Sequence, residues 1–272
     1  MRVVVITQVP PAAHGLTALL EGLGHEPVAL LCSRQNAPRY GEFLEHVRDA
    51  PEVLDVVIPA ARDRIAPLLR AYEPDVAVCV GFPWKIPPDA LAVPRFGIVN
   101  GHPSLLPRYR GPSPVSWAIR NGETELGFTF HRMDAELDTG PILAQTSFPL
   151  GDEHGWDELE PKLTEVVTDL LPRALERVEQ GDAGESQPDG AGGYFSTFEP
   201  EYAWIDWSAP AGEIRRKVQA WRFHAFTPGP RGALTELDGE TVRVLRVSLQ
   251  PAEGRQVECA DGTLWIVERE PA

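Results

Sequence analysis

Short apolar runs alternate with segments of helical periodicity along the first part of the chain. The first run, Val3 to Ile6, is β-branched throughout, and leucines at positions 16, 19, 20 and 23 then follow at helical spacing. Similar apolar runs occupy residues 27–32, 53–58 and 76–80, with helical patterns at 43–47 and 65–72. This alternation predicts a parallel sheet covered on both faces, in which the wholly apolar run at 76–80 is central.

The same pattern continues to about residue 180 and then stops. A short strand at 97–100 precedes a long irregular segment, two strands at 125–133 and 142–148 surround the loop DAELDTGP, and apolar positions from 156 to 178 predict an amphipathic helix. Residues 181–193 are polar and rich in glycine, which is typical of a domain boundary. We therefore expect one domain over residues 1–190 and a second over 191–272.

The second domain is expected to be small and rich in β-structure. A helix begins near Ser208, and four strand patterns follow at 233–237, 242–249, 257–260 and 264–267. Asp238-Gly239 and Asp261-Gly262 are typical of hairpin turns between them. The predicted fold class is thus α/β, a doubly wound and mostly parallel sheet with a smaller β-rich domain at the carboxyl end.

Charge and cysteine content exclude several classes of function. The formal net charge is −15, and so acidic a protein repels nucleic acid unless its basic residues are clustered. The three cysteines are far apart in the sequence, which indicates neither a disulfide framework nor a thiolate metal site, so we expect no metal. With no apolar stretch long enough for a membrane span or a signal segment, a cytoplasmic location and no membrane partner are expected.

Candidate catalytic side chains come from two separate stretches. Asn100 and His102 end a predicted buried strand and, being two residues apart, point to the same side. Asp138 lies in the second loop, where a carboxylate could pair with the imidazole. An amide that binds an oxyanion, with a His and Asp pair that takes a proton, suits acyl transfer to an amine. The alternatives are ordinary turns at Asn-Gly and His-Pro, and a loop-capping role for Asp138.

These residues stand within a longer pattern that resembles a known family. The stretches NGHPSLLPRYRG from Asn100, GFTFHRMD from Gly127 and LDTGPI from Leu137 are similar to the core of the 10-formyltetrahydrofolate-dependent formyltransferases. The stretch AWIDWS from Ala203 and residues 235–245 resemble the carboxy-terminal domain of the family's methionyl-tRNA and amino-sugar members. The resemblance implies a Rossmann-like formyltransferase domain and an OB-like second domain, shortened here by several strands.

The resemblance also implies roles for individual residues. The family's catalytic Asn, His and Asp fall on Asn100, His102 and Asp138, and the formyl donor is 10-formyltetrahydrofolate. Its pterin ring would lie against the loop from Phe82 to Ile86 and the backbone beside Asp138, which makes the cofactor-binding candidates Phe82, Trp84, Lys85, Ile86, Glu136 and Leu137. Arg108, Tyr109 and Arg110 are candidates for binding the acceptor, whereas His131 is expected to be structural.

The distribution of charge along the chain favours a small-molecule acceptor. Residues 203–272 contain nine basic and ten acidic residues, and residues 33–50, where the tRNA enzymes carry a basic loop, contain three of each. Because affinity for tRNA depends on Lys and Arg contacts to phosphates, a small amine such as an amino sugar or another metabolite is the expected acceptor. Methionyl-tRNA is the alternative acceptor. A formyl-folate hydrolase and a non-catalytic folate-binding protein are further alternatives.

Overall fold

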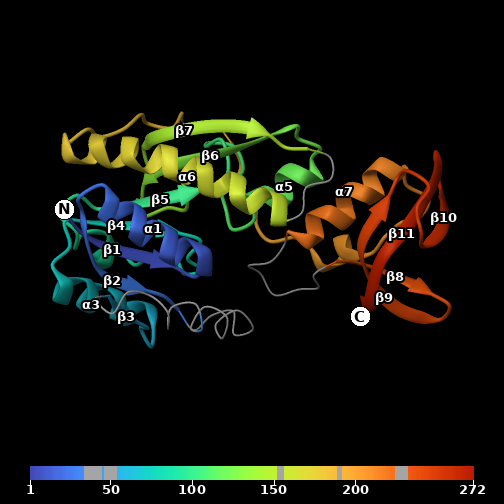
Figure 1. The fold of residues 1–272 in the computed structure, drawn as a ribbon, viewed down its shortest axis with the longest axis horizontal. Helices are drawn as coiled ribbons and strands as arrows, with labels where there is room; N and C mark the ends of the chain where they lie inside the picture. Colours follow the sequence, from blue (N-terminus) through green and yellow to red (C-terminus); the bar gives the residue numbers. More distant parts are fainter. Residues whose placement is uncertain (34–44, 46–53, 152–155, 189–191, 224–231) are drawn as a thin grey trace. The chain divides into compact units, whose positions relative to one another are not determined.

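The computed structural model describes residues 1–33, 45, 54–151, 156–188, 192–223 and 232–272. They form two compact units (Figure 1). The first comprises Met1–Gly111, Gly127–Phe148 and Glu160–Tyr194, and the second comprises Pro112–Leu126, Pro149–Leu159 and Phe195–Ala272. The chain passes between the units more than once, and the expected division at residue 190 stays a prediction.

A seven-stranded sheet forms the centre of the first unit. Its strand order is β3-β2-β1-β4-β5-β6-β7. The strands are β1 (Arg2–Thr7), β2 (Glu26–Leu31), β3 (Asp55–Val57), β4 (Val76–Val80), β5 (Ile98–His102), β6 (Glu125–Arg132) and β7 (Ile142–Pro149). The first five run parallel, and β6 is antiparallel to β5. The predicted mostly parallel sheet is therefore confirmed, and β4 is its middle strand as expected.

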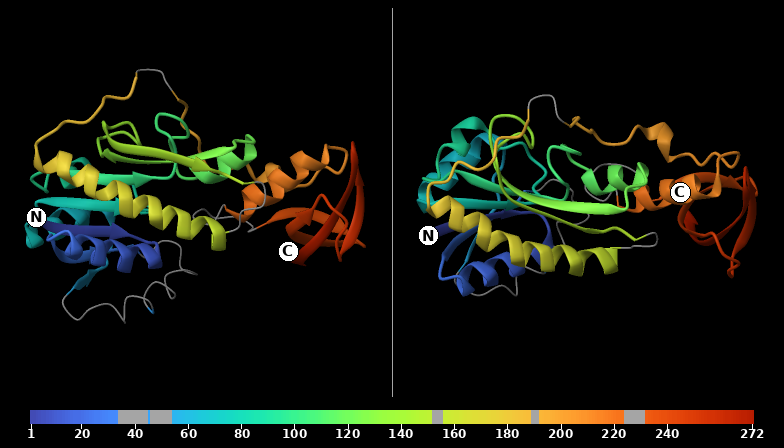
Figure 2. Two further views of the ribbon diagram at one scale, coloured as in Figure 1. Left: turned by 45° about the horizontal axis from the view of Figure 1, so that its top comes forward. Right: turned by 90° about the horizontal axis from the view of Figure 1, so that it is seen from above.

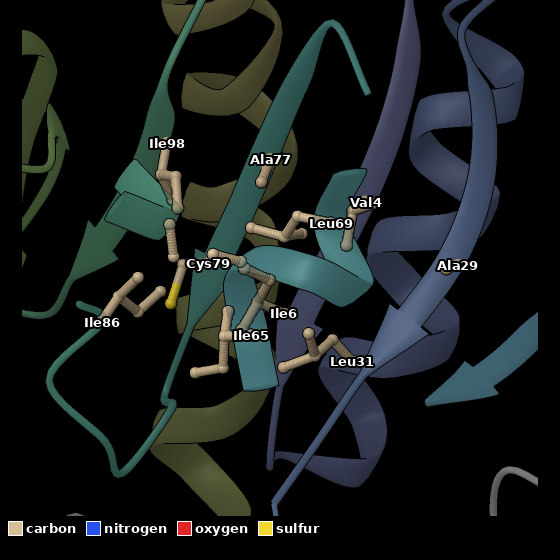
Figure 3. Packing of buried hydrophobic residues seen from close by; sticks show 12 residues of the cluster. Val4, Ile6, Ala29, Leu31, Ile65, Leu69, Ala77, Cys79, Ile86 and Ile98 are labelled. Carbon is tan, nitrogen blue, oxygen red and sulfur yellow. The ribbon is translucent and has the colours of Figure 1, made fainter. Parts of the chain in front are cut away.

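Helices cover both faces of this sheet. In the two views of Figure 2, α1 (Pro10–Gly22) and α6 (Trp156–Glu179) lie along one face, while α3 (Ile65–Tyr72) lies on the other. Figure 3 shows the α3 face, where alternate residues of β1 and β4 point into one apolar cluster with Ile65 and Leu69. A 3₁₀ turn (η1, Arg62–Arg64) precedes α3, and the short helix α4 (Pro88–Leu91) packs against it.

The second unit contains a four-stranded antiparallel sheet and helices. The strands β8 (Ala233–Leu237), β9 (Glu240–Ser248), β10 (Arg255–Cys259) and β11 (Gly262–Pro271) are ordered β10-β11-β9-β8. The helices are α5 (Pro114–Arg120), the 3₁₀ turn η2 (Pro200–Ala203) and α7 (Ala211–Arg222). Asp238 and Gly239 both have positive φ, 55° and 84°, as a tight hairpin turn between β8 and β9 requires. The prediction of a β-rich second unit is confirmed.

Most predicted elements differ from the observed ones only at their ends. β11 is longer than its pattern at 264–267 indicated, because it pairs with both β9 and β10. The helix expected over residues 43–47 lies outside the described residues, apart from Glu45. Within the described part of the chain, no helix is both long enough and apolar enough to span a membrane.

Candidate active site

Asn100 and His102 lie at the end of β5, on the same side of the strand. β5 is enclosed between β4 and the antiparallel β6, so this end of the strand is held firmly on both edges. The His102 side chain is buried, and Asn100 is half-buried. Both side chains therefore project from a rigid part of the sheet.

Asp138 is brought to them by a tightly folded loop between β6 and β7. The Asp134 Oδ1 atom caps this loop by accepting hydrogen bonds from the Glu136 N–H and the Thr139 hydroxyl. Gly140 passes so close to the Arg132 carbonyl that an added Cβ would lie 1.8 Å from its oxygen. Asp138 itself has a φ of 58°, a left-handed conformation that Asp tolerates better than most residues. The capping role considered for Asp138 is thus performed by Asp134.

The three predicted catalytic side chains meet around one carboxylate oxygen. Asp138 Oδ1 lies 3.4 Å from Asn100 Nδ2 and 3.6 Å from His102 Nδ1. The other oxygen, Oδ2, accepts a 2.8 Å hydrogen bond from the backbone N–H of Gly111. One oxygen of Asp138 is therefore anchored to the backbone, and the other faces the amide and the imidazole.

The hydrogen bonds of His102 define its tautomer. Its Nε2 lies 2.9 Å from the carbonyl oxygen of Tyr109, which can only accept, so Nε2 carries the proton. In the neutral ring, Nδ1 is then an unprotonated acceptor that faces Asp138 Oδ1. Burial, the largest influence, lowers the pKa of His102 and keeps the ring neutral, although the charge of Asp138 acts in the opposite direction. The two facing acceptors can take up one proton between them.

Asp138 is ionised while His102 is neutral. Burial alone would raise its pKa, but the imidazoles of His102 and His131 and the Gly111 N–H outweigh that effect. The pKa of the carboxyl group is accordingly held below its ordinary value. The site therefore presents a half-buried negative charge beside a neutral, buried imidazole.

His131 is a fourth member of this cluster, which the sequence did not indicate. In the β5–β6 register it lies directly opposite Asn100, and its Nε2 is 3.0 Å from Asn100 Nδ2. Its Nδ1 donates to the Arg132 carbonyl oxygen at 2.9 Å, so Nε2 accepts from the Asn100 amide. One N–H of Asn100 is thereby occupied, while the second points toward Asp138 over a longer distance.

Two family models match this chain. The model of the Formyl transferase family matches residues 3–175, and that of the Formyl transferase C-terminal domain matches residues 198–272. The chain belongs to the formyl transferase family. The resemblance stated from the sequence is therefore confirmed.

Individual formyl transferase relatives cover most of the chain. A protein from Geobacter metallireducens named methionyl-tRNA formyltransferase is 35% identical over 213 residues, which are 74% of this chain and 67% of that one. Another protein of that name, from Citrifermentans bemidjiense, is 36% identical over 213 residues, 74% of this chain and 65% of that one. The matched region therefore spans about two thirds of the length of these relatives.

Solved structures of similar fold include HypX from Aquifex aeolicus in complex with tetrahydrofolic acid, at a TM-score of 0.73 and 22% identity over 100% of this chain and 44% of that one. At this identity the likeness shows the fold alone.

The residues proposed to bind the folate lie on two neighbouring loops. Phe82 and Trp84 are half-buried, with their rings edge to face at 5.9 Å, and Ile86 belongs to the buried apolar cluster. Lys85 and Glu136 are more exposed and approach each other to 3.7 Å, which links this loop to the one that carries Leu137 and Asp138. The role of these residues in binding the cofactor stays a prediction.

The three residues proposed to bind the acceptor differ in their surroundings. Arg108 is exposed, and its guanidinium lies 5.5 Å from the centre of the Tyr109 ring. The Tyr109 side chain is buried, and it is the backbone carbonyl of this residue that contacts His102. Arg110 is bound by Gln187 through Nε and Nη2, at 3.1 and 2.6 Å. Their contact with an acceptor stays a prediction.

Proposed function

We propose that this protein transfers the formyl group of 10-formyltetrahydrofolate to the amino group of methionyl-tRNA. The observation that carries the proposal is the meeting of Asn100, His102 and Asp138 around the Asp138 Oδ1 atom. These three groups supply what formyl transfer to an amine needs, namely an oxyanion donor and a proton acceptor side by side.

The reaction can be derived from the groups present. The neutral amine attacks the formyl carbon, a new C–N bond forms, and the carbonyl oxygen gains negative charge. The second N–H of Asn100 binds this oxygen in exchange for its long, 3.4 Å contact with Asp138 Oδ1. The amine proton passes to the acceptor pair of His102 Nδ1 and Asp138 Oδ1. The bond to N10 of the folate then breaks, the same pair returns its proton to N10, and tetrahydrofolate and the formylated amine are released.

The names of the relatives contradict the expectation of a small-molecule acceptor. Eight curated relatives, 32 to 37% identical to this chain, all carry the name methionyl-tRNA formyltransferase. The charge count that favoured a small amine was a sum over residues 203–272 and took no account of where the charges lie within that stretch. In the structure, α7 (AGEIRRKVQAWR) gathers four basic residues against one acidic residue on a single helix. A basic helix of this kind is compatible with tRNA phosphates despite the acidic total.

The proposal is tested with the purified protein and 10-formyltetrahydrofolate. Methionyl-tRNA, amino sugars, amino acids and buffer alone are supplied in parallel, and tetrahydrofolate release and formylated product are measured. We expect product with methionyl-tRNA at a kcat/KM far above that of any other amine. Release of tetrahydrofolate in buffer alone at the same rate, or formylation of another amine in preference to methionyl-tRNA, would contradict the proposal.

A further inference from the structure

The glycine-rich segment after α6 is bound to the first unit over much of its described length. Glu185 exchanges two backbone hydrogen bonds with Ile142, at 2.8 and 2.9 Å. Gly192 passes the carbonyl of Pro107 so closely that a Cβ would lie 1.7 Å from its oxygen, and Tyr194 forms a β-bridge with Arg110. We call residues 182–188 the clasp segment. Its course beside the catalytic loops distinguishes it from an unattached linker.

Gln187 makes the central contacts of the clasp segment. Its Nε2 donates to the carbonyl oxygens of Asp138 and Gly140, at 2.9 and 2.8 Å. Its Oε1 accepts from Nε and Nη2 of Arg110. A single carboxamide thus joins the loop that carries Asp138 to the loop that carries Arg110.

These two loops meet a second time at the catalytic carboxylate. Gly111, the residue after Arg110, donates its N–H to Asp138 Oδ2. The backbone of Asp138 is in the left-handed region. A residue other than glycine keeps this conformation only where surrounding contacts hold it. Gln187 therefore fixes the backbone of the same residue whose side chain must face His102.

The carboxamide of Gln187 makes both sets of bonds because it has a donor and an acceptor. The carbonyl oxygens of Asp138 and Gly140 require a donor, and the guanidinium of Arg110 requires an acceptor. Glutamate would keep the bond to Arg110 but would place a carboxylate against two carbonyl oxygens. Methionine has nearly the same size and offers neither bond. These two substitutions therefore separate the donor function from the acceptor function.

We propose that Gln187 is a positioning residue for the reaction, because it holds Asp138 opposite His102 by binding the Asp138 loop to the Arg110 loop. The inference rests on the proposed function. Misplacement of a catalytic group by about 1 Å can reduce turnover by up to about 100-fold without loss of substrate binding. The expected effect is consequently on kcat rather than on KM.

The kinetic test compares Gln187→Met and Gln187→Glu with Gln180→Met and Gln180→Glu. Gln180 is exposed at the end of α6 and bonds to Glu176, so it is a matched control outside the site. We expect both Gln187 variants to lower kcat by about 10- to 100-fold, with KM for the folate changed less than about threefold, and the Gln180 variants to match the wild type. A Gln187→Glu variant with wild-type kcat would overturn the proposal, because the carbonyl bonds would then be dispensable.

A second readout does not depend on catalysis. The charge of Asp138 raises the pKa of His102, while burial and the nearby His131 lower it. If Gln187→Met lets Asp138 move away, the His102 ring should titrate at lower pH than in the wild type, as followed by NMR of the imidazole carbons. A purely structural role would lower the thermal midpoint and leave this titration unchanged, which would overturn the proposal.

The two proposals can fail independently. If the wild type formylates no amine, the proposed function fails, whereas a shifted His102 titration in Gln187→Met would still support the positioning role. If Gln187→Met does not fold, Gln187→Asn keeps both polar functions but is one methylene too short to join the loops. It should then show the same loss of kcat and the same lower titration of His102, and wild-type values for both would overturn the proposal.

Discussion

The catalytic group of the first unit and a cluster of aromatic rings in the second are held together in different ways. In the first unit, Asn100, His102 and Asp138 each have specific partners for their polar atoms. In the second unit, Trp117, Phe198, Tyr202 and Trp221 pack as a group of rings, with the Arg120 guanidinium 3.7 Å from the centre of the Tyr202 ring. Hydrogen bonds fix where an atom lies, whereas packed rings mainly contribute apolar area. Substitutions in the catalytic group should therefore remove chemistry, and substitutions in the ring cluster should remove stability.

The largest stability effect is expected from Trp221→Ala. Trp221 is 2% exposed and lies within ring-contact distance of both Phe198 and Tyr202. Removing a buried Trp side chain typically costs about 3–5 kcal/mol, because the cavity that remains is only partly refilled. Denaturant unfolding should show this loss. A decrease below about 1 kcal/mol would mean that the ring cluster does not stabilise the second unit.

The largest catalytic effect is expected from Asn100→Ala. The loss of one oxyanion donor lowers kcat by about 100- to 1,000-fold in comparable sites. Asn100 is half-buried, so the thermal midpoint should change little, in contrast to Trp221→Ala. Asp138→Asn, which keeps the shape but removes the proton acceptor, should reduce kcat to a similar extent. A variant at either position that keeps more than about a tenth of wild-type kcat would remove that residue from the mechanism.

Much of the first unit was predictable from the sequence, because strand patterns and motifs are local features of the chain. The wholly apolar run at 76–80 indicated a central strand, and the spacing of Asn100 and His102 placed both side chains on one side. The pairing of His131 with Asn100 was not predictable, since it depends on the register of two antiparallel strands. A strand pattern shows which face a residue occupies but not which residue lies opposite.

Two further features escaped prediction because they depend on contacts between distant residues. Gln187 lies in a segment whose composition is typical of a linker, and its partners are 47 to 77 residues away in the sequence. The charge of α7 was hidden by an average over a window that also contains acidic hairpins such as that at Asp238. Electrostatic attraction depends on where charges gather in space, which a sum along the chain does not give.

The role of α7 can be tested by reversing its charge. If α7 contacts tRNA phosphates, Arg216→Glu with Arg222→Glu should raise KM for methionyl-tRNA by about tenfold and flatten its dependence on salt, with kcat unchanged. Arg246→Glu with Arg269→Glu is the matched control, since it makes the same change in net charge at exposed residues of β9 and β11. Steady-state kinetics at several salt concentrations distinguish the two. Equal effects of both changes would indicate a response to net charge rather than a basic helix.

The smallest effect concerns the response of the two units to acid. His102 is buried and neutral, and burial lowers its folded-state pKa below the ordinary value. Below pH 6.5 the unfolded chain binds a proton at this residue that the folded chain does not, so stability decreases as the pH falls. Asp138, whose pKa is also lowered, adds a loss of the same sign at still lower pH. The described part of the second unit contains no histidine.

Peptide-resolved hydrogen exchange can measure this difference between the units. After correction for the intrinsic dependence of exchange on pH, peptides from β5 and β6 should lose protection between pH 7 and pH 5.5, whereas peptides from β9 and β11 should lose less. His102→Gln should reduce the loss in the first unit, because the glutamine does not titrate. His25, whose pKa burial also lowers, would account for what remains. Equal losses in both units would show that the buried imidazole does not control the response to acid.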